Sequence, residues 1–348
     1  MSAPQLIVVS LRGSGTPLLA RITTALGYAP QGTMAGFPHD GDDAGPGPGE
    51  VSPVLRAAYG QTEAARLLRG QHDHHQELET AFQLAVAALW RIWWTRLGQP
   101  VTAVSPVDPV LQERLSRVPD TDLHRLLPGR GCWYVNSLDL ERADADLLRT
   151  WHARARPPIV YHHRDVRDRI IELIRMLSHP AGDVGTLPEH LVYRDIVNAL
   201  PGMDARITLA LTDPGFPGMS EARRCGWLLH HPAVCVLTHE ELTGSAQGGT
   251  DGARDRALYR LLAAIGHPHP PAALTALPEP ASRDLPVGIW RRYFNPEHER
   301  LLERHYPDLL PPAPDAARHP VDPARKDVPP ARRRGEPVVD SRSSPGGP

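Results

Sequence analysis

The chain opens with an apolar segment that is followed by a glycine-rich turn and a helical pattern. Residues Gln5–Leu11 are mostly apolar and β-branched, which predicts a buried strand. Gly13 and Gly15 favour a tight turn after this strand. Pro17 suits the first position of a helix, because its missing N–H would have no partner there. Gly27 is placed to cap the other end of that helix.

Three later apolar segments repeat the order of strand and helix. They are Cys132–Leu138, Pro158–His162 and Ala233–Thr238, and each precedes a helical pattern. Alternation of strands and helices favours a parallel sheet that is covered on both faces. The sequence therefore predicts an α/β fold, a parallel sheet flanked by helices.

A long helix is predicted between the first two of these four strands. Residues 76–97 carry apolar side chains at helical spacing, which indicates a wide buried face. The tryptophans of this segment are therefore expected in the core rather than on a ligand platform. The apolar positions are Phe82, Ala85, Val86, Leu89, Trp90 and Trp93.

Two segments are poor in large apolar residues. Residues 36–52 are rich in Gly, Asp and Pro and are predicted to form a long loop, and loops of that length are often functional. From about Pro311 onward the chain is mostly Pro, Arg, Asp and Ser, so it buries too little to fold. We therefore expect one α/β domain over residues 1–310 and a disordered tail over 311–348.

Composition narrows the class of partner. The 348 residues have a formal net charge of −2, so no global charge points to nucleic acid or to an anionic membrane. The three cysteines are far apart, which fits a reducing compartment. No apolar run approaches the length of a membrane span, and no signal-peptide pattern is visible. These features predict a soluble, cytoplasmic protein, and they carry no signal for its oligomeric state.

The turn after the first strand has the chemistry of an anion-binding loop. Its glycines let the backbone approach an anion, and the following helix offers free N–H groups at the positive end of its dipole. Ser14 and Thr16 add hydroxyl groups, and Arg12 adds a fixed charge. The alternative is an ordinary βα turn. A GxxxxGK[ST] loop is excluded, because the only lysine of the chain is Lys326.

Two further segments place arginines at positions suited to binding a phosphate. Arg164 follows the apolar strand that ends at His162, and an arginine at such a junction is able to clamp a phosphate with two hydrogen bonds. The alternative is a surface ion pair between Arg164 and Asp168 at helical spacing. Arg283 lies at the start of the segment 282–294. The alternative to a phosphate-binding role for Arg283 is a charged side chain that is solvated in a loop.

Together these segments resemble the PAPS-dependent sulfotransferases, where PAPS is 3′-phosphoadenosine 5′-phosphosulfate. Ser14-Gly15-Thr16 resembles the 5′-phosphosulfate loop P-[KR]-S-G-[ST]-T-x-L, and Arg164 with Asp168 resembles R-[DN]-P-x-D. Segment 282–294 resembles R-K-G-x-x-G-x-W-x-x-x-F, and Val236–Leu242 resembles a strand ending in Y-E-D-L. The resemblance extends over residues 5–306.

The resemblance implies a P-loop-type fold and PAPS as cofactor. It implies that the 5′-phosphosulfate is held by Arg12, Gly13, Ser14, Gly15 and Thr16, and that Arg164 and Arg283 both hold the 3′-phosphate. The sequence departs from the family pattern at Gly13, in place of Lys or Arg, at Pro17, in place of a hydroxyl residue, and at Glu172, in place of serine. A carboxylate at Glu172 is expected to repel a 3′-phosphate.

A catalytic base is required to take the proton of the acceptor. Many family members carry K-T-H or K-D-P-R on the strand that here reads Val135 to Asp139, and Asp139 is a weak substitute. Other members carry a glutamate in the loop after the first helix, where His39 and Glu50 are the candidates. His124 has no motif behind it. The histidines of segment 71–75 do not share one helical face, so no metal site is expected there.

We therefore expect a sulfotransferase that transfers a sulfonate group from PAPS to a hydroxyl of a small-molecule acceptor, such as a specialised metabolite. The alternative from another class is a protein of the same fold that has lost transfer and acts as a binding or partner protein. Gly13, Pro17, Asn136 and Glu172 favour this alternative. A P-loop phosphotransferase is disfavoured by the missing lysine.

Overall fold

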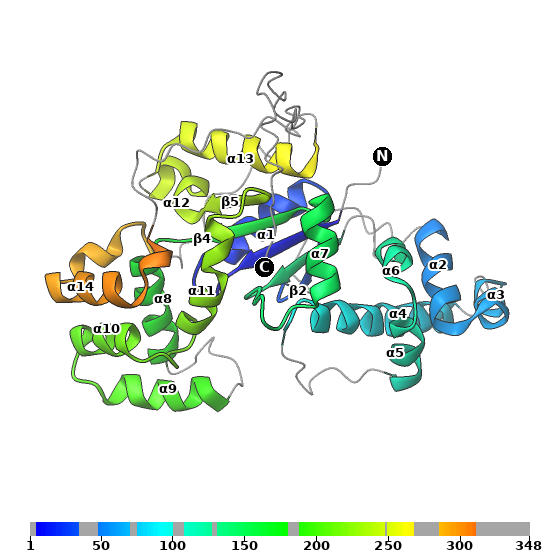
Figure 1. The fold of residues 1–348 in the computed structure, drawn as a ribbon, viewed down its shortest axis with the longest axis horizontal. Helices are drawn as coiled ribbons and strands as arrows, with labels where there is room; N and C mark the ends of the chain where they lie inside the picture. The colour runs from blue at the N-terminus through cyan, green and yellow to red at the C-terminus, as the bar shows by residue number, and fades with distance from the viewer. Residues whose placement is uncertain are drawn as a thin grey trace, which may run out of the picture. The chain divides into compact units, whose positions relative to one another are not determined.

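A five-stranded parallel sheet forms the centre of the fold (Figure 1), with strand order β2-β3-β1-β4-β5 in the computed structural model. The strands are β1 (Leu6–Ser10), β2 (Ala29–Gly32), β3 (Gly131–Val135), β4 (Ile159–His163) and β5 (Val234–Thr238). The described residues are 5–34, 48–69, 75–99, 108–126, 131–179, 188–247, 249–267 and 285–310. The predicted α/β class with a parallel sheet is confirmed.

The α-helices of the described residues connect and cover these strands. They are α1 (Thr16–Ala25), α2 (Pro48–Tyr59), α3 (Gln61–Arg69), α4 (His75–Arg96), α5 (Pro109–Ser116), α6 (Asp120–Leu126), α7 (Ala145–Arg154), α8 (Val166–Ser178), α9 (Pro188–Ala199), α10 (Met203–Thr212), α11 (Met219–Cys225), α12 (His239–Leu242), α13 (Asp251–Ile265) and α14 (Pro296–His305). Short 3₁₀ helices are η1 (Gly226–Leu229), η2 (Gly244–Gln247), η4 (Ile289–Arg292) and η5 (Pro307–Leu309).

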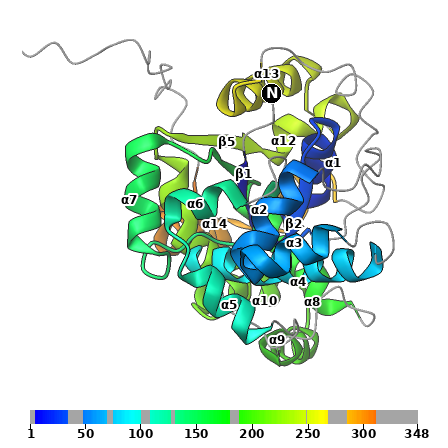
Figure 2. The same cartoon turned by 90° about the vertical axis from the view of Figure 1, so that its right-hand side faces the viewer.

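The three central strands, β1, β3 and β4, are buried on both faces of the sheet, as their continuous apolar sequences require. Alternate residues of β1 point to opposite sides, so that Leu6 and Val8 pack with helices α1 and α13, whereas Ile7 and Val9 belong to the larger core. That larger core includes side chains of α4, α7 and α8, while α2, α3, α5 and α6 pack around one another and α4 (Figure 2). Both faces are therefore covered by helices.

Helix α4 and its tryptophans are placed as the sequence predicts. Trp93 is buried, and Trp90 stacks on Trp94 with ring centroids 4.7 Å apart and on Trp133 of β3 at 6.0 Å. These contacts make the tryptophans part of the apolar core on one face of the sheet.

The prediction for residues 36–52 is wrong at its C-terminal end, because helix α2 begins at Pro48. Residues 35–47 lie outside the described part of the chain, as do residues 311–348, for which the sequence predicts disorder. In the described residues, no helix combines the length and the apolarity that crossing a bilayer would require.

Candidate anion-binding site at the phosphate loop

The loop between β1 and α1 is closed by two glycines with positive φ. Gly13 has φ +81° and Gly15 has φ +79°, a left-handed conformation that residues with a side chain rarely adopt. The amide of Ser14 donates to the carbonyl of Leu11 at 3.1 Å, which closes the turn. Helix α1 begins at Thr16, so its first N–H groups have no intrahelical acceptor and form the positive end of the helix dipole. The tight turn and the helix start that the sequence predicts are present, and binding of an anion there stays a prediction.

Both glycines are also required by their neighbours. A Cβ atom on Gly15 would lie 2.3 Å from Nδ1 of His239, which opens helix α12 and packs directly against the loop. A Cβ atom on Gly13 would lie 3.3 Å from Cγ of Arg169 and 3.5 Å from Cγ of Glu172. The glycine that stands where the sulfotransferase pattern has Lys or Arg therefore follows from the conformation of this loop.

The hydroxyl groups of the loop have different surroundings. Ser14 is fully buried, and no residue of the described chain accepts or donates a hydrogen bond at its Oγ atom. Thr16 is half-buried, and its Oγ1 lies 2.8 Å from Oγ of Ser10, the last residue of β1. A buried hydroxyl without a partner costs free energy, so Ser14 marks a position where a further polar group would be favoured.

Arg12 is turned toward helix α9. Its Nη1 lies 3.2 Å from Nδ1 of His190, a buried residue of that helix. Burial lowers the pKa of Arg12, and the charges of Glu221 and Glu189 partly offset this effect. The structure thus places the Arg12 guanidinium between the loop and α9.

Arg164 joins the loop to the C-terminal segment. It is 2% exposed, and it donates from Nη1 to the Gly13 carbonyl at 3.3 Å and from Nη2 to the Leu285 carbonyl at 2.9 Å. Its Nε atom is buried without a partner among the described residues. Arg283 lies outside the described residues, but Leu285 follows it closely in the chain. The hydrogen bond to Leu285 brings the segment after Arg283 to Arg164, and the joint role predicted for Arg164 and Arg283 stays a prediction.

The alternative of a surface ion pair between Arg164 and Asp168 is wrong, because both residues are buried. Asp168, in the first turn of α8, accepts hydrogen bonds from the amides of Gly288 at 2.6 Å and Trp290 at 2.9 Å. Burial raises the pKa of this carboxyl, while the two amides act in the opposite direction. Asp168 therefore fastens the segment 285–290 beside the loop.

Replacing Asp168 by Asn is expected to destabilise the fold by roughly 1.5–3 kcal/mol, the usual range for a hydrogen bond to a charged group. An amide side chain has one acceptor oxygen, so one of the two backbone N–H groups would face another donor. Urea denaturation measures the loss, and hydrogen exchange at the amides of Gly288 and Trp290 locates it. The control is Asp146→Asn on α7, whose exposed ion pair with Arg149 is worth little. Unchanged exchange at both amides would contradict the assignment.

Glu172 is neutralised within its own helix. It is 8% exposed and forms an ion pair with Arg175, one turn later on α8, with Nε and Oε2 3.2 Å apart. The negative charge that the sequence places beside the loop is therefore accompanied by a positive one, which weakens the repulsion expected for a phosphate.

Two buried histidines flank the loop, and the sequence analysis missed both. His162 on β4 has Nδ1 3.0 Å from Oγ of Ser10, and its ring centroid lies 6.1 Å from that of His239. Neither ring is exposed. Burial lowers the pKa of His239 to about 3 and that of His162 well below its usual value. The only sequence signal for these two residues was their place at the end of an apolar strand: His162 lies in β4, and His239 directly follows β5.

The catalytic roles expected of the candidate bases His39 and Glu50 stay predictions. His39 lies outside the described residues, and Glu50 lies in the first turn of α2 rather than in a loop. His124 lies on helix α6.

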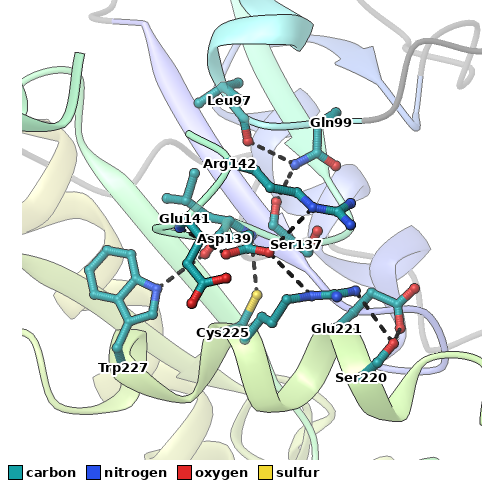
Figure 3. Close-up of polar contacts among 12 residues, drawn as sticks. Leu97, Gln99, Ser137, Asp139, Glu141, Arg142, Ser220, Glu221, Cys225 and Trp227 are labelled. Carbon is teal, nitrogen blue, oxygen red and sulfur yellow. Dashed lines mark hydrogen bonds and ion pairs between the residues drawn. The ribbon is translucent and has the colours of Figure 1, made fainter. Parts of the chain in front are cut away.

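Asp139 belongs to a polar cluster that follows β3 (Figure 3). It is buried, and its Oδ2 lies 3.4 Å from Nε of Arg224 and 3.7 Å from Nε of Arg142. Its Oδ1 accepts the amide of Glu141 at 3.0 Å. In the same cluster Gln99 donates to the Ser137 carbonyl at 2.5 Å (Figure 3). Asp139 thus holds the chain after β3 in place, and its surroundings do not favour a role as base.

Other chemistry is not assembled in the described residues. Within them, no group of three His, Cys, Asp or Glu side chains is placed to hold a metal ion. The cysteines Cys132, Cys225 and Cys235 are free thiols. Residues 71–74 lie outside the described ranges, and His75 opens helix α4.

Comparisons with known proteins gave no match, whether with protein-family models, with curated proteins or with solved structures.

Proposed function

We propose that the protein is a sulfotransferase that binds PAPS at the loop between β1 and α1 and transfers its sulfonate group to a hydroxyl of a small molecule. The observation that carries the proposal is the buried, unpartnered Ser14 Oγ and Arg164 Nε beside the N-terminus of α1. Buried hydroxyl and guanidinium groups normally have partners, and the two oxyanion groups of one bound nucleotide would supply a partner to each. A cytoplasmic location and a specialised metabolite as acceptor belong to the same proposal.

The residues fit the two charged ends of this cofactor. The backbone of Gly13–Thr16 with the Ser14 hydroxyl would hold the 5′-phosphosulfate, and Arg164, with Arg283 two residues before Leu285, would hold the 3′-phosphate. The bound cofactor would supply an activated sulfonate group. The chain's own contribution is to fix these anions by N–H and O–H donors and by arginine charge, which disperses the charge of the leaving phosphate.

A second candidate function is nucleotide binding without transfer. Transfer requires a base at the acceptor. Asp139, the acidic residue after β3, is ion-paired with Arg142 and Arg224 instead. If the protein binds the nucleotide but releases no sulfonate from PAPS in the presence of any hydroxyl acceptor, this second function replaces the first.

Nucleotide binding is tested with PAP, the desulfonated cofactor, by thermal shift and calorimetry. A ligand that binds only the folded state stabilises it by about 2.7 kcal/mol at a concentration of 100 Kd, so the melting temperature is expected to rise. Adenosine is the control, because it lacks both phosphate groups. Absence of a shift and of binding heat at millimolar PAP would refute both candidate functions.

Arg164→Ala separates two roles of this arginine. If Arg164 holds the 3′-phosphate, PAP binding is expected to weaken by about 10- to 150-fold, which corresponds to roughly 1.5–3 kcal/mol. Adenosine 5′-phosphosulfate lacks the 3′-phosphate, so its affinity is expected to change little. Equal weakening of both ligands would instead assign Arg164 to the support of the loop through the Gly13 and Leu285 carbonyls. Arg283→Ala, compared in the same way, tests its predicted share in the 3′-phosphate site.

A further inference from the structure

A chain of three side chains leads from the interior of the sheet to the phosphate loop. His162 Nδ1 lies 3.0 Å from Ser10 Oγ, which lies 2.8 Å from Thr16 Oγ1. His162 and Ser10 are buried, whereas Thr16 is half-buried and opens helix α1. This hydrogen-bond chain therefore ends in the protein interior at His162 and ends at the partly exposed loop at Thr16.

The direction of these hydrogen bonds depends on which nitrogen of His162 carries the proton. Burial, together with nearby His239, holds the pKa of His162 well below its usual value, so the ring is neutral and has a single N–H. Its Nε2 atom is buried and has no partner among the described residues. Orphaned buried N–H groups are rarer than orphaned acceptors, so the proton is favoured at Nδ1, where Ser10 accepts it.

A proton at Nδ1 of His162 determines the direction of the hydrogen bonds made by the hydroxyl groups of Ser10 and Thr16. When His162 donates to Ser10 Oγ, the Ser10 proton is directed to Thr16 Oγ1 at 2.8 Å. The Thr16 oxygen then acts as an acceptor toward Ser10, and its own proton points away from β1. Chains of hydrogen bonds polarise one another, which makes the last donor stronger.

We propose that His162 and Ser10 are positioning residues that turn the Thr16 hydroxyl into a hydrogen-bond donor for an oxyanion in the loop. The proposal rests on the proposed function, because the oxyanion is the 5′-phosphosulfate of the nucleotide. It also specifies the ligand chemistry. The atom facing Thr16 must accept a hydrogen bond, so the loop selects an unprotonated sulfonate or phosphate oxygen.

The proton position is measured without any ligand. In a long-range ¹H–¹⁵N spectrum of protein labelled at histidine, His162 is expected to show a protonated Nδ1 and a bare Nε2. The signal is assigned from its loss in His162→Asn or, should that variant not fold, from its shift in Ser10→Ala. A protonated Nε2 would overturn the proposal, because Ser10 would then donate to His162 and Thr16 to Ser10.

The positioning role is tested by PAP affinity in a double-mutant cycle. Ser10→Ala is expected to weaken PAP binding by about two- to tenfold in the wild-type background and to have no effect in Thr16→Val, because Ser10 acts only through Thr16. Thr23→Val is the matched control, since Thr23 is a buried threonine of the same helix whose hydroxyl bonds Tyr134 at 2.8 Å. It should leave PAP affinity unchanged.

Equal effects of Ser10→Ala in both backgrounds would overturn the positioning role. If the wild-type protein binds no PAP, the proposed function fails. The tautomer of His162 then still decides the direction of the hydrogen bonds from His162 through Ser10 to Thr16.

Discussion

Gly15→Ala is expected to destabilise the protein by about 2–5 kcal/mol. The left-handed conformation of Gly15, with φ +79°, costs a residue with a side chain about 1–2 kcal/mol. The new Cβ atom would lie 2.3 Å from the buried ring of His239, and such overpacking costs a further 1–3 kcal/mol or so. Urea denaturation measures the sum. The loop would shift as well, so PAP binding is expected to be lost.

Gly27→Ala is the matched control for this substitution. Gly27 has nearly the same backbone conformation, with φ +83°, but a Cβ atom there meets nothing within 4 Å. Its replacement is therefore expected to cost only the backbone term, about 1–2 kcal/mol. In the variant Gly15→Ala/His239→Ala the overlap disappears, so the two changes should cost less together than the sum of the single changes. Equal costs at Gly15 and Gly27 would show that His239 does not restrain the loop.

The strands that the sequence predicts are those with continuous apolar segments. Such segments fit the interior of a parallel sheet, where both faces are buried, and the fully buried strands β1, β3 and β4 follow this rule. Strand β5 is apolar as well, but it lies at an edge and is only partly buried. Strand β2 was missed because Ala29-Pro30-Gln31-Gly32 contains two residues that are rare in strands. Its edge position tolerates the proline. A glycine is required at position 32 by its tertiary contacts, because a Cβ atom there would lie 2.1 Å from the Tyr134 carbonyl oxygen.

The candidate site was predictable where its residues are neighbours in sequence. Gly13 and Gly15 predict the turn between β1 and α1, because a left-handed backbone conformation favours glycine. The surroundings of the loop depend on distant residues. Helical spacing favours a local pair of Arg164 and Asp168, whereas Asp168 binds amides that lie about 120 positions later. His239 packs on Gly15 only because β5 and β1 both flank β4. No local pattern encodes these contacts.

The second large effect is a loss of stability in mild acid, caused by three buried histidines, two at the end of β4 and one at the start of α12. Burial lowers the pKa of His163 to about 4 and that of His239 to about 3, and the pKa of His162 is also well below its usual value. In the unfolded chain histidine titrates near 6.5. Below that pH the unfolded state binds protons that the folded state excludes. Stability is therefore retained above about pH 6.5 and falls as the pH decreases toward 4.

The size of the effect follows from proton linkage. Each excluded proton costs about 1.4 kcal/mol per pH unit. Because an unfolded histidine is half-protonated at about pH 6.5, three histidines remove on the order of 5 kcal/mol between about pH 6.5 and pH 5. That is comparable to the whole stability of a typical domain, about 5–15 kcal/mol. Burial raises the pKa of Asp168 and Glu240, which acts in the opposite direction and offsets part of the loss.

The slope of unfolding free energy against pH counts the excluded protons directly, so a single substitution is able to test one histidine. Urea denaturation is measured at several values between about pH 7 and pH 5, and the wild-type slope in the acidic part is expected to approach three protons. His239→Gln removes a titrating group while keeping a neutral polar side chain, and its slope should be lower by about one proton. His230→Gln, at an exposed position, is the control and should retain the wild-type slope. An unchanged slope in His239→Gln would mean that this ring is hydrated or paired in the folded protein.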